Sequence, residues 1–219
     1  MQPFEPHFHV LPPAQQELWP ELAEVPKHFV LYGGTALALR LGHRSSVDFD
    51  FFTSKSFAPN DLLRLVPMLA AAKVLQNVSQ TLTVSLNRGE EVKLSFFGNL
   101  HLGRVGEPQI TPDGVLKVGS LLDLAGMKAA VITQRAESKD YLDLLALLEH
   151  GISLPHAMAA AASIYGAQYN PALTVKSLTY FGDGDLYKLT REQQNQLVRI
   201  ASAAELSLPE VPRIADTLS

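Results

Sequence analysis

The chain has 219 residues, of which 47% are hydrophobic and 18% are charged, and its formal net charge is −4 at pH 7. This length and hydrophobic content are enough to bury a full core, and no apolar run approaches the ~20 residues of a membrane span. The absence of cysteine excludes disulfides, zinc–thiolate sites and thiol nucleophiles. We expect a cytoplasmic protein with no membrane partner, and the acidic charge argues mildly against a broad nucleic-acid-coating surface.

The first predicted elements are a short helix and a strand. Residues 13–23 are predicted to form a helix that Pro20 kinks, with Trp19 as an anchor at the edge of the core. An apolar strand follows at residues 28–32 and runs into Gly33, Gly34 and Thr35. Glycines let the backbone approach a ligand closely, and Thr35 is a suitable N-cap for a helix over residues 36–41. The N–H groups at such a helix start favour an anion, so this bend is predicted to bind phosphate.

A second strand is predicted at residues 47–52, where side chains alternate between two faces. Val47, Phe49 and Phe51 are expected to face the core. Asp48 and Asp50 then emerge together on the other face, roughly 7 Å apart at Cα from the rise of a strand. Two carboxylates so placed can converge on one Mg²⁺ (or Mn²⁺), which prefers oxygen ligands together with substrate phosphates.

A helix and three strands are predicted next. The helix begins at Asn60 or Asp61 and runs to about residue 72, with Pro67 inside it and Leu65 on its apolar stripe. The strands cover residues 74–78, 81–86 and 92–97 and complete a small mixed sheet with the first two strands. On the last strand Lys93 and Ser95 share one face, either as its ordinary polar side or as part of a site.

The second half of the chain is predicted to be helical. After a connecting loop at residues 98–117, Ser120 begins a helix to about residue 134 that carries Lys128, and Asp140 opens a helix at residues 141–150. Lys128 on a face of small residues is compatible with a surface lysine that extends to solvent. Asp140 and Asp143 are compatible with acids that complement the helix dipole. Further helices are predicted at residues 156–165, 171–179 and 191–204.

Several spaced blocks resemble one protein family. GGT at 33–35, HRSSVDFD at 43–50, DLAGMK at 123–128, KDYLDL at 139–144 and KSLTYFGD at 176–183 resemble the nucleotidyltransferase superfamily, and more narrowly the AbiEii/AbiGii toxin family. The resemblance implies an α+β fold, a small mixed sheet flanked by helices with a C-terminal helical bundle. It implies a nucleotidyltransferase core over residues 1–118 and a helical region over 119–219 that packs on the core and completes the site.

The resemblance also assigns roles to residues. Asp48 and Asp50 are the metal ligands and catalytic acids, and Lys128 is a site lysine that pairs with phosphate oxygens. Asp140 orients or deprotonates the acceptor hydroxyl. The substrate-binding residues are Gly33, Gly34, Thr35, Arg44 and Lys93.

The implied function is metal-dependent transfer of a nucleotide from an NTP to an acceptor hydroxyl on RNA, protein or a small molecule. The resemblance implies a toxin with a possible cognate antitoxin, whose relatives include enzymes that add nucleotides to tRNA ends. Many nucleotidyltransferases carry a third carboxylate on the strand that matches residues 92–97, and here Ser95 takes roughly that place. A catalytically weak or inactive nucleotide- or protein-binding module is therefore one alternative, and an antibiotic-modifying nucleotidyltransferase is another.

Overall fold

The computed structural model describes residues 4–218, which form two compact units. Unit 1 consists of residues 4–102, 107–120 and 216–218, and unit 2 of residues 103–106 and 121–215. The main crossing between the units falls between Ser120 and Leu121, two residues beyond the predicted boundary. Residues 103–106 belong to unit 2 although the chain on both sides of them belongs to unit 1, and residues 216–218 return to unit 1. Nothing in the composition of these segments predicts this.

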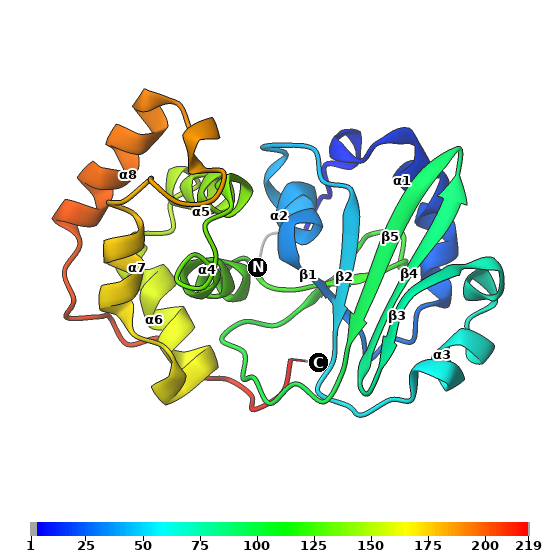
Figure 1. The fold of residues 1–219 in the computed structure, drawn as a ribbon. Helices are drawn as coiled ribbons and strands as arrows, with labels where there is room; N and C mark the ends of the chain where they lie inside the picture. The colour runs from blue at the N-terminus through cyan, green and yellow to red at the C-terminus, as the bar shows by residue number, and fades with distance from the viewer. Residues whose placement is uncertain (1–3, 219) are drawn as a thin grey trace. The chain divides into compact units, whose positions relative to one another are not determined.

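Within the described residues, unit 1 is built on a mixed seven-stranded sheet in the order β3-β4-β5-β2-β1-β7-β6. Figure 1 labels the five strands β1 to β5 of this sheet. β2 pairs in parallel with β5 and β1 in parallel with β7, and the other neighbouring pairs are antiparallel. The predicted α+β class with a mixed sheet is confirmed. The strands are β1 (Val30–Tyr32), β2 (Asp48–Phe52), β3 (Lys73–Val78), β4 (Thr81–Arg88), β5 (Glu90–Phe97), β6 (Gln109–Ile110) and β7 (Lys117–Val118).

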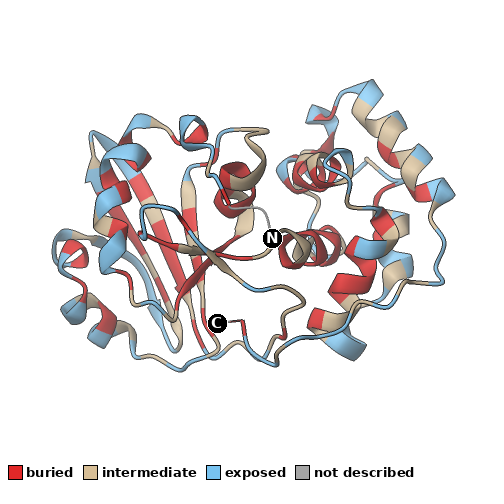
Figure 2. Cartoon of the chain, turned by 180° about the vertical axis from the view of Figure 1, so that it is seen from behind, coloured by how far each residue is buried: buried red, intermediate tan, exposed pale blue. Residues whose placement is uncertain are grey.

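Aromatic side chains fill the core on one face of this sheet. Phe51 stacks on Phe96 with ring centroids 5.1 Å apart, and Phe29 meets the same ring edge-on at 5.3 Å. Phe49 and Phe51 are fully buried, as the strand alternation predicted, and the central strands are largely buried (Figure 2). Val47 was expected in the core but is 54% exposed, because β2 begins one residue after it.

The helices of unit 1 are shorter than predicted where proline intervenes. Trp19 begins a 3₁₀ segment directly after the first helix, is buried, and donates from Nε1 to Asp113 Oδ2 at 2.8 Å. The predicted helix over 60–72 is two pieces, because Val66 is extended before Pro67 as sterics require. Leu65 consequently lies on the surface, 75% exposed. The helical segments are Phe8–Val10 (3₁₀), α1 (Pro13–Leu18), Trp19–Glu24 (3₁₀), α2 (Gly33–Leu41), α3 (Pro59–Leu65) and Pro67–Ala71 (3₁₀).

The longer segment of unit 2 is mainly helical up to residue 203. Its helices are α4 (Leu121–Val131), α5 (Ser138–Glu149), α6 (Leu154–Tyr165), α7 (Pro171–Ser177) and α8 (Arg191–Ala203), with 3₁₀ turns at Gly166–Gln168 and Leu186–Lys188. Gly126 lets α4 lie close to α6, because a Cβ there would be 2.8 Å from the Ala161 nitrogen and 2.9 Å from the Ala160 carbonyl carbon. Among residues 4–218 no single helix is long and apolar enough to cross a membrane, although α5 and Leu154–Gln168 pass that test together across a 117° bend.

An acid from a distant loop stabilises the start of α5. Asp185 Oδ1 accepts from the Ser138 backbone N–H at 2.5 Å, and Oδ2 pairs with Lys188 Nζ at 2.9 Å. A negative charge at a helix N-terminus is favoured by the unpaired N–H groups there. These two contacts, the backbone hydrogen bond first, lower the pKa of Asp185 to about 2. The loop can approach α5 this closely because Gly184 adopts φ +55° against the Ala136 carbonyl.

We predict that Asp185→Asn lowers the melting temperature of the protein at pH 7. The pKa of the Asp185 carboxyl is about 2 in the folded protein, against an ordinary value of 3.8 for the unfolded chain. Ionised Asp185 therefore stabilises the fold fully above about pH 4, and this stabilisation is lost as the pH falls through 2. Thermal unfolding of both proteins between pH 7 and pH 2 measures this. Equal melting temperatures at pH 7, or a difference that stays constant with pH, would contradict the assignment, and the exposed Glu210→Gln is the control.

Candidate active site

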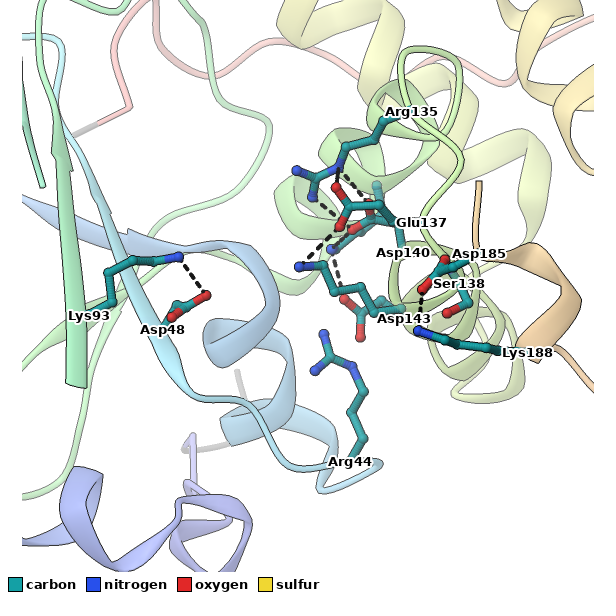
Figure 3. A network of polar contacts seen from close by, with 12 residues as sticks. Arg44, Asp48, Lys93, Arg135, Glu137, Ser138, Asp140, Asp143, Asp185 and Lys188 are labelled. Carbon is teal, nitrogen blue, oxygen red and sulfur yellow. Dashed lines mark hydrogen bonds and ion pairs between the residues drawn. The ribbon is translucent and has the colours of Figure 1, made fainter. Parts of the chain in front are cut away.

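The two predicted acids of β2 share one face of the sheet in unit 1. Asp48 and Asp50 are half-buried, whereas Phe49 between them is fully buried on the other face. The parallel register places Asp48 beside Lys93 and Asp50 beside Ser95 on β5. Lys93 Nζ lies 3.0 Å from Asp48 Oδ2, with both side chains partly exposed (Figure 3). The structure therefore brings the predicted acids and the predicted lysine together.

The glycine bend lies directly against the second of these acids. Register pairs Tyr32, the last residue of β1, with Asp50, so the chain turns into α2 beside the Asp50 carboxylate. Gly33 has φ +74°, and a Cβ at this position would be 2.9 Å from Asp50 Oδ2. Any other residue would be strained there and would also displace the carboxylate. The α2 start and the carboxylate face thus form one cluster, as the sequence predicted.

Thr35 holds this cluster together from inside and is not the helix N-cap that was predicted. α2 begins at Gly33 with Tyr32 as N-cap, and Tyr32 provides no side-chain capping hydrogen bond. Thr35 is the third helical residue and is buried. Its hydroxyl donates to the Asp48 carbonyl oxygen and hydrogen-bonds the Ser46 hydroxyl at 2.9 Å. The side chain therefore ties the start of α2 to the start of β2.

Arg44 brings a positive charge to the same helix start. Its guanidinium Nη2 lies 2.6 Å from the position that a Cβ of Gly34 would take, and Nη1 donates to the Ser45 carbonyl at 2.9 Å. A guanidinium and a helix N-terminus both favour an anion, and arginine is well suited to phosphate. Arg44 and Gly34 therefore lie together at the helix start where phosphate binding was predicted.

The donor set for a divalent cation consists of two carboxylates. Within the described residues there is no group of three or more His, Cys, Asp or Glu side chains that could hold a metal ion. Ser95, the register partner of Asp50, is 4% exposed and takes roughly the place at which the resemblance implies a third acid. Mg²⁺ is commonly held by only one or two carboxylates together with phosphate oxygens and water. Asp48 and Asp50 on one half-exposed face fit that mode.

In unit 2 a buried lysine lies between two buried aspartates. Lys128 Nζ is 2.5 Å from Asp140 Oδ1 and 2.7 Å from Asp143 Oδ2. Both carboxylates have no exposed side-chain area and the lysine only 8% (Figure 3 labels the two aspartates). Lys128 is therefore not a surface lysine extending to solvent. Asp140 and Asp143 do more than complement the dipole of α5, because both form ion pairs with Lys128.

Arg135 completes this lysine cluster. It donates to Asp140 from Nε at 2.7 Å and from Nη2 at 3.2 Å. Burial of the Asp140 carboxyl favours its neutral form, but the Arg135 hydrogen bond and the Lys128 charge outweigh burial and lower its pKa. An aspartate held ionised in this way is a weak proton acceptor. Arg135 and Asp143 were not singled out as catalytic from the sequence, although the i, i+3 spacing of Asp140 and Asp143 was a usable signal.

Solved structures with a similar fold include a nucleotidyltransferase. MenT4, a nucleotidyltransferase toxin from Mycobacterium tuberculosis H37Rv, has a similar fold with a TM-score of 0.59, covering 88% of this chain and 83% of that one at 15% identity. JHP933 from Helicobacter pylori is similar with a TM-score of 0.52, covering 86% of this chain and 88% of that one at 19% identity. At such identities the likeness shows the fold alone.

Sequence comparison shows the family. Residues 21–216 match the family described as nucleotidyl transferase AbiEii toxin of type IV toxin–antitoxin systems. The chain belongs to this family and is a nucleotidyltransferase. It is also 35% identical over 158 residues to an uncharacterized protein of Aquifex aeolicus (strain VF5), a match that covers 71% of this chain and 74% of that protein.

We predict that Gly33→Ala weakens binding of an NTP, because a Cβ there displaces the Asp50 carboxylate and strains a positive φ. Gly89→Ala is the matched control, since Gly89 also has a positive φ (+81°) but has nothing within 4 Å of its Cβ position. Both variants are expected to lose about 1–2 kcal/mol of stability. Calorimetric NTP titration of the two measures the difference, and equal NTP affinities would show that the bend does not shape the site.

We also predict that Lys128→Met destabilises the protein by about 3–5 kcal/mol, because it leaves buried carboxylates uncompensated. The triple variant with Asp140→Asn and Asp143→Asn should recover much of this loss. Lys139→Met is the surface control, since Lys139 is 53% exposed and pairs with Glu137, and it should cost no more than ~1 kcal/mol. Urea unfolding of the variants tests this. Equal losses for the Lys128 and Lys139 variants would refute an internal ion-paired cluster.

Proposed function

We propose that this nucleotidyltransferase moves a nucleoside monophosphate from an NTP to a hydroxyl of RNA, with Mg²⁺ held by Asp48 and Asp50. The observation that carries the proposal is the Asp48–Asp50 face lying against the Gly33 bend in unit 1. In the reaction the acceptor oxygen forms a bond to the α-phosphorus. The bond from that phosphorus to the bridging oxygen breaks, pyrophosphate leaves, and the hydroxyl proton passes to solvent. The metal, when bound, offsets the charge that develops on the phosphate oxygens.

The residues of unit 1 bind and orient the triphosphate in this proposal. The backbone N–H groups of Gly33 and Gly34 at the start of α2 receive phosphate oxygens, and Arg44 adds a fixed positive charge beside them. Lys93 balances the charge of Asp48 before the nucleotide binds. Lys93 would lie beside a triphosphate bound at this face, in keeping with its predicted role in substrate binding.

The lysine cluster of unit 2 takes a different role from the one first predicted for Asp140. The resemblance assigns Lys128 to the phosphates, and a lysine must be protonated and fixed in position to do this. Asp140 and Asp143 fix the Lys128 Nζ from two sides. Because the pKa of Asp140 is lowered, we assign it to positioning Lys128 rather than to deprotonating the acceptor.

The toxin role is proposed from the family to which the chain belongs, and the RNA acceptor from the resemblance to tRNA-modifying relatives. The chain belongs to a family of toxins of toxin–antitoxin systems, so a cognate antitoxin is the expected partner. RNA is the acceptor implied by the resemblance to enzymes that add nucleotides to tRNA ends. A chain with net charge −4 has no overall positive field, so RNA would be bound through local groups such as Arg44 and Lys93.

We predict that Asp48→Asn lowers transfer from a labelled NTP to total RNA by on the order of 10²-fold or more, since several kcal/mol of charge stabilisation depends on the bound cation. Chelation of divalent cations by EDTA should abolish transfer in the wild-type protein, and added Mg²⁺ or Mn²⁺ should restore it. Asp61→Asn is the control, because Asp61 is 55% exposed on α3 and pairs only with Arg64 in the described contacts. Full turnover in Asp48→Asn would remove the basis of the catalytic assignment.

A second candidate function is a module that binds nucleotide without transferring it. Ser95 beside Asp50 and the Lys93–Asp48 ion pair favour it, because both reduce the number of oxygens offered to a metal. The same titrations separate the two functions. NTP binding without turnover on RNA, protein or small-molecule acceptors, in the presence of Mg²⁺ or Mn²⁺, would select the binding module.

A further inference from the structure

Unit 2 contains a cavity of about 190 Å³ that the proposed reaction does not use. One side of it is the α4–α5 connection, residues 132–136, together with Tyr141. The other side is the segment after α7, with Ser177, Tyr180 and Asp183. These three residues belong to KSLTYFGD, the block of the family resemblance that has no role in the function proposed above. This block of the sequence therefore lines a cavity, and we consider which ligand the cavity could bind.

Tyr180 places an aromatic ring at this cavity. Tyr180 is 58% exposed, whereas its neighbour Phe181 packs edge-on against Tyr141 with ring centroids 6.4 Å apart. The Tyr180 hydroxyl folds back over its own loop, and a Cβ at Gly182 would be only 2.5 Å from it. Glycine at 182 is thus what allows this ring position. An exposed aromatic face of this kind is a platform on which a planar group can stack.

The rest of the lining combines hydrogen-bond donors and acceptors with apolar side chains such as Ile132 and Leu186. Arg135 contributes a guanidinium, Gln134 a side-chain amide, and Asp183 an exposed carboxylate. The Tyr141 hydroxyl is already used, since it donates to the Ser177 carbonyl at 3.3 Å. A ring that carries both donors and acceptors on its edge fits this lining, and a hydrocarbon does not.

The size limits the ligand to a single ring system. Pockets that hold whole drug-sized ligands have volumes of ~300–1,000 Å³, well above this one. We propose that the cavity is a nucleobase subsite, in which a base stacks on Tyr180 and is hydrogen-bonded by Arg135 and Asp183. The inference rests on the proposed function, which supplies nucleotides as ligands, and it deepens that function by naming where a base is recognised. The base belongs either to the NTP or to an acceptor nucleotide.

A base bound in the subsite would alter the hydrogen bonds of the lysine cluster, because the two share Arg135. Arg135 lines the cavity and at the same time donates two hydrogen bonds to Asp140, which holds Lys128. A base that draws on the Arg135 guanidinium changes the position of these donors. One side chain therefore links recognition of a base to the positioning of the buried lysine.

The test is calorimetric titration of the full chain with AMP, CMP, GMP and UMP, and with inorganic phosphate as a probe that has no base. The wild-type protein should bind at least one monophosphate more tightly than phosphate. Tyr180→Ala should weaken that binding by about ten-fold, the usual scale of base–aromatic stacking, and Asp183→Asn should change the preference among bases. Tyr187→Ala is the matched control, because Tyr187 is 76% exposed and lies outside the cavity lining.

The source of the base is read from transfer kinetics of the same variants. A higher KM for the NTP in Tyr180→Ala assigns the subsite to the donor, and a higher KM for RNA assigns it to the acceptor. Equal monophosphate affinity in wild-type, Tyr180→Ala and Asp183→Asn proteins would overturn the subsite even if Asp48→Asn abolishes transfer. Base binding that depends on Tyr180 in a protein that transfers nothing would support the subsite and count against the proposed function.

Discussion

The pairing of β1 with β2 is the constraint on which the position of the two acids of unit 1 depends. Its antiparallel register sets Tyr32 opposite Asp50, so the chain must leave β1 for α2 beside that carboxylate. The parallel pairing of β2 with β5 then sets Lys93 and Ser95 beside the two acids. Since one-residue slips turn every side chain to the opposite face, the buried Phe49 and Phe51 fix this register and thereby the acids.

The strand pattern made this half of the site predictable from the sequence. Alternation with period two placed Asp48 and Asp50 on one face of their strand and their phenylalanine neighbours on the other. It also placed Lys93 and Ser95 on one face of the later strand. What failed were boundaries that depend on single residues. Thr35 has the chemistry of an N-cap, but α2 begins at Gly33 because a positive φ there turns the chain earlier. Pro67 ended a helix that the apolar spacing would have continued.

The lysine cluster shows a different limit. Nothing in the spacing of Lys128 on α4 distinguishes a surface lysine from a buried one, because burial depends on acids that α5 brings from further along the chain. Only the resemblance favoured a site role. The structure adds the physical reason, since the positive charge is enclosed by two carboxylates whose own exposure is nil. Arg135, reaching Asp140 from the connection between the helices, was equally invisible to periodicity.

The close contact of α4 with α6 has a consequence for how this protein can vary. Gly126 precedes Lys128 by two positions, and its missing side chain leaves room for the backbone of Ala160 and Ala161. A larger residue at position 126 would push α4 away from α6 and shift the helix that carries Lys128. We therefore expect only small residues at positions 126, 160 and 161, because they allow the packing that holds the helix of Lys128, although none of the three takes part in its ion pairs.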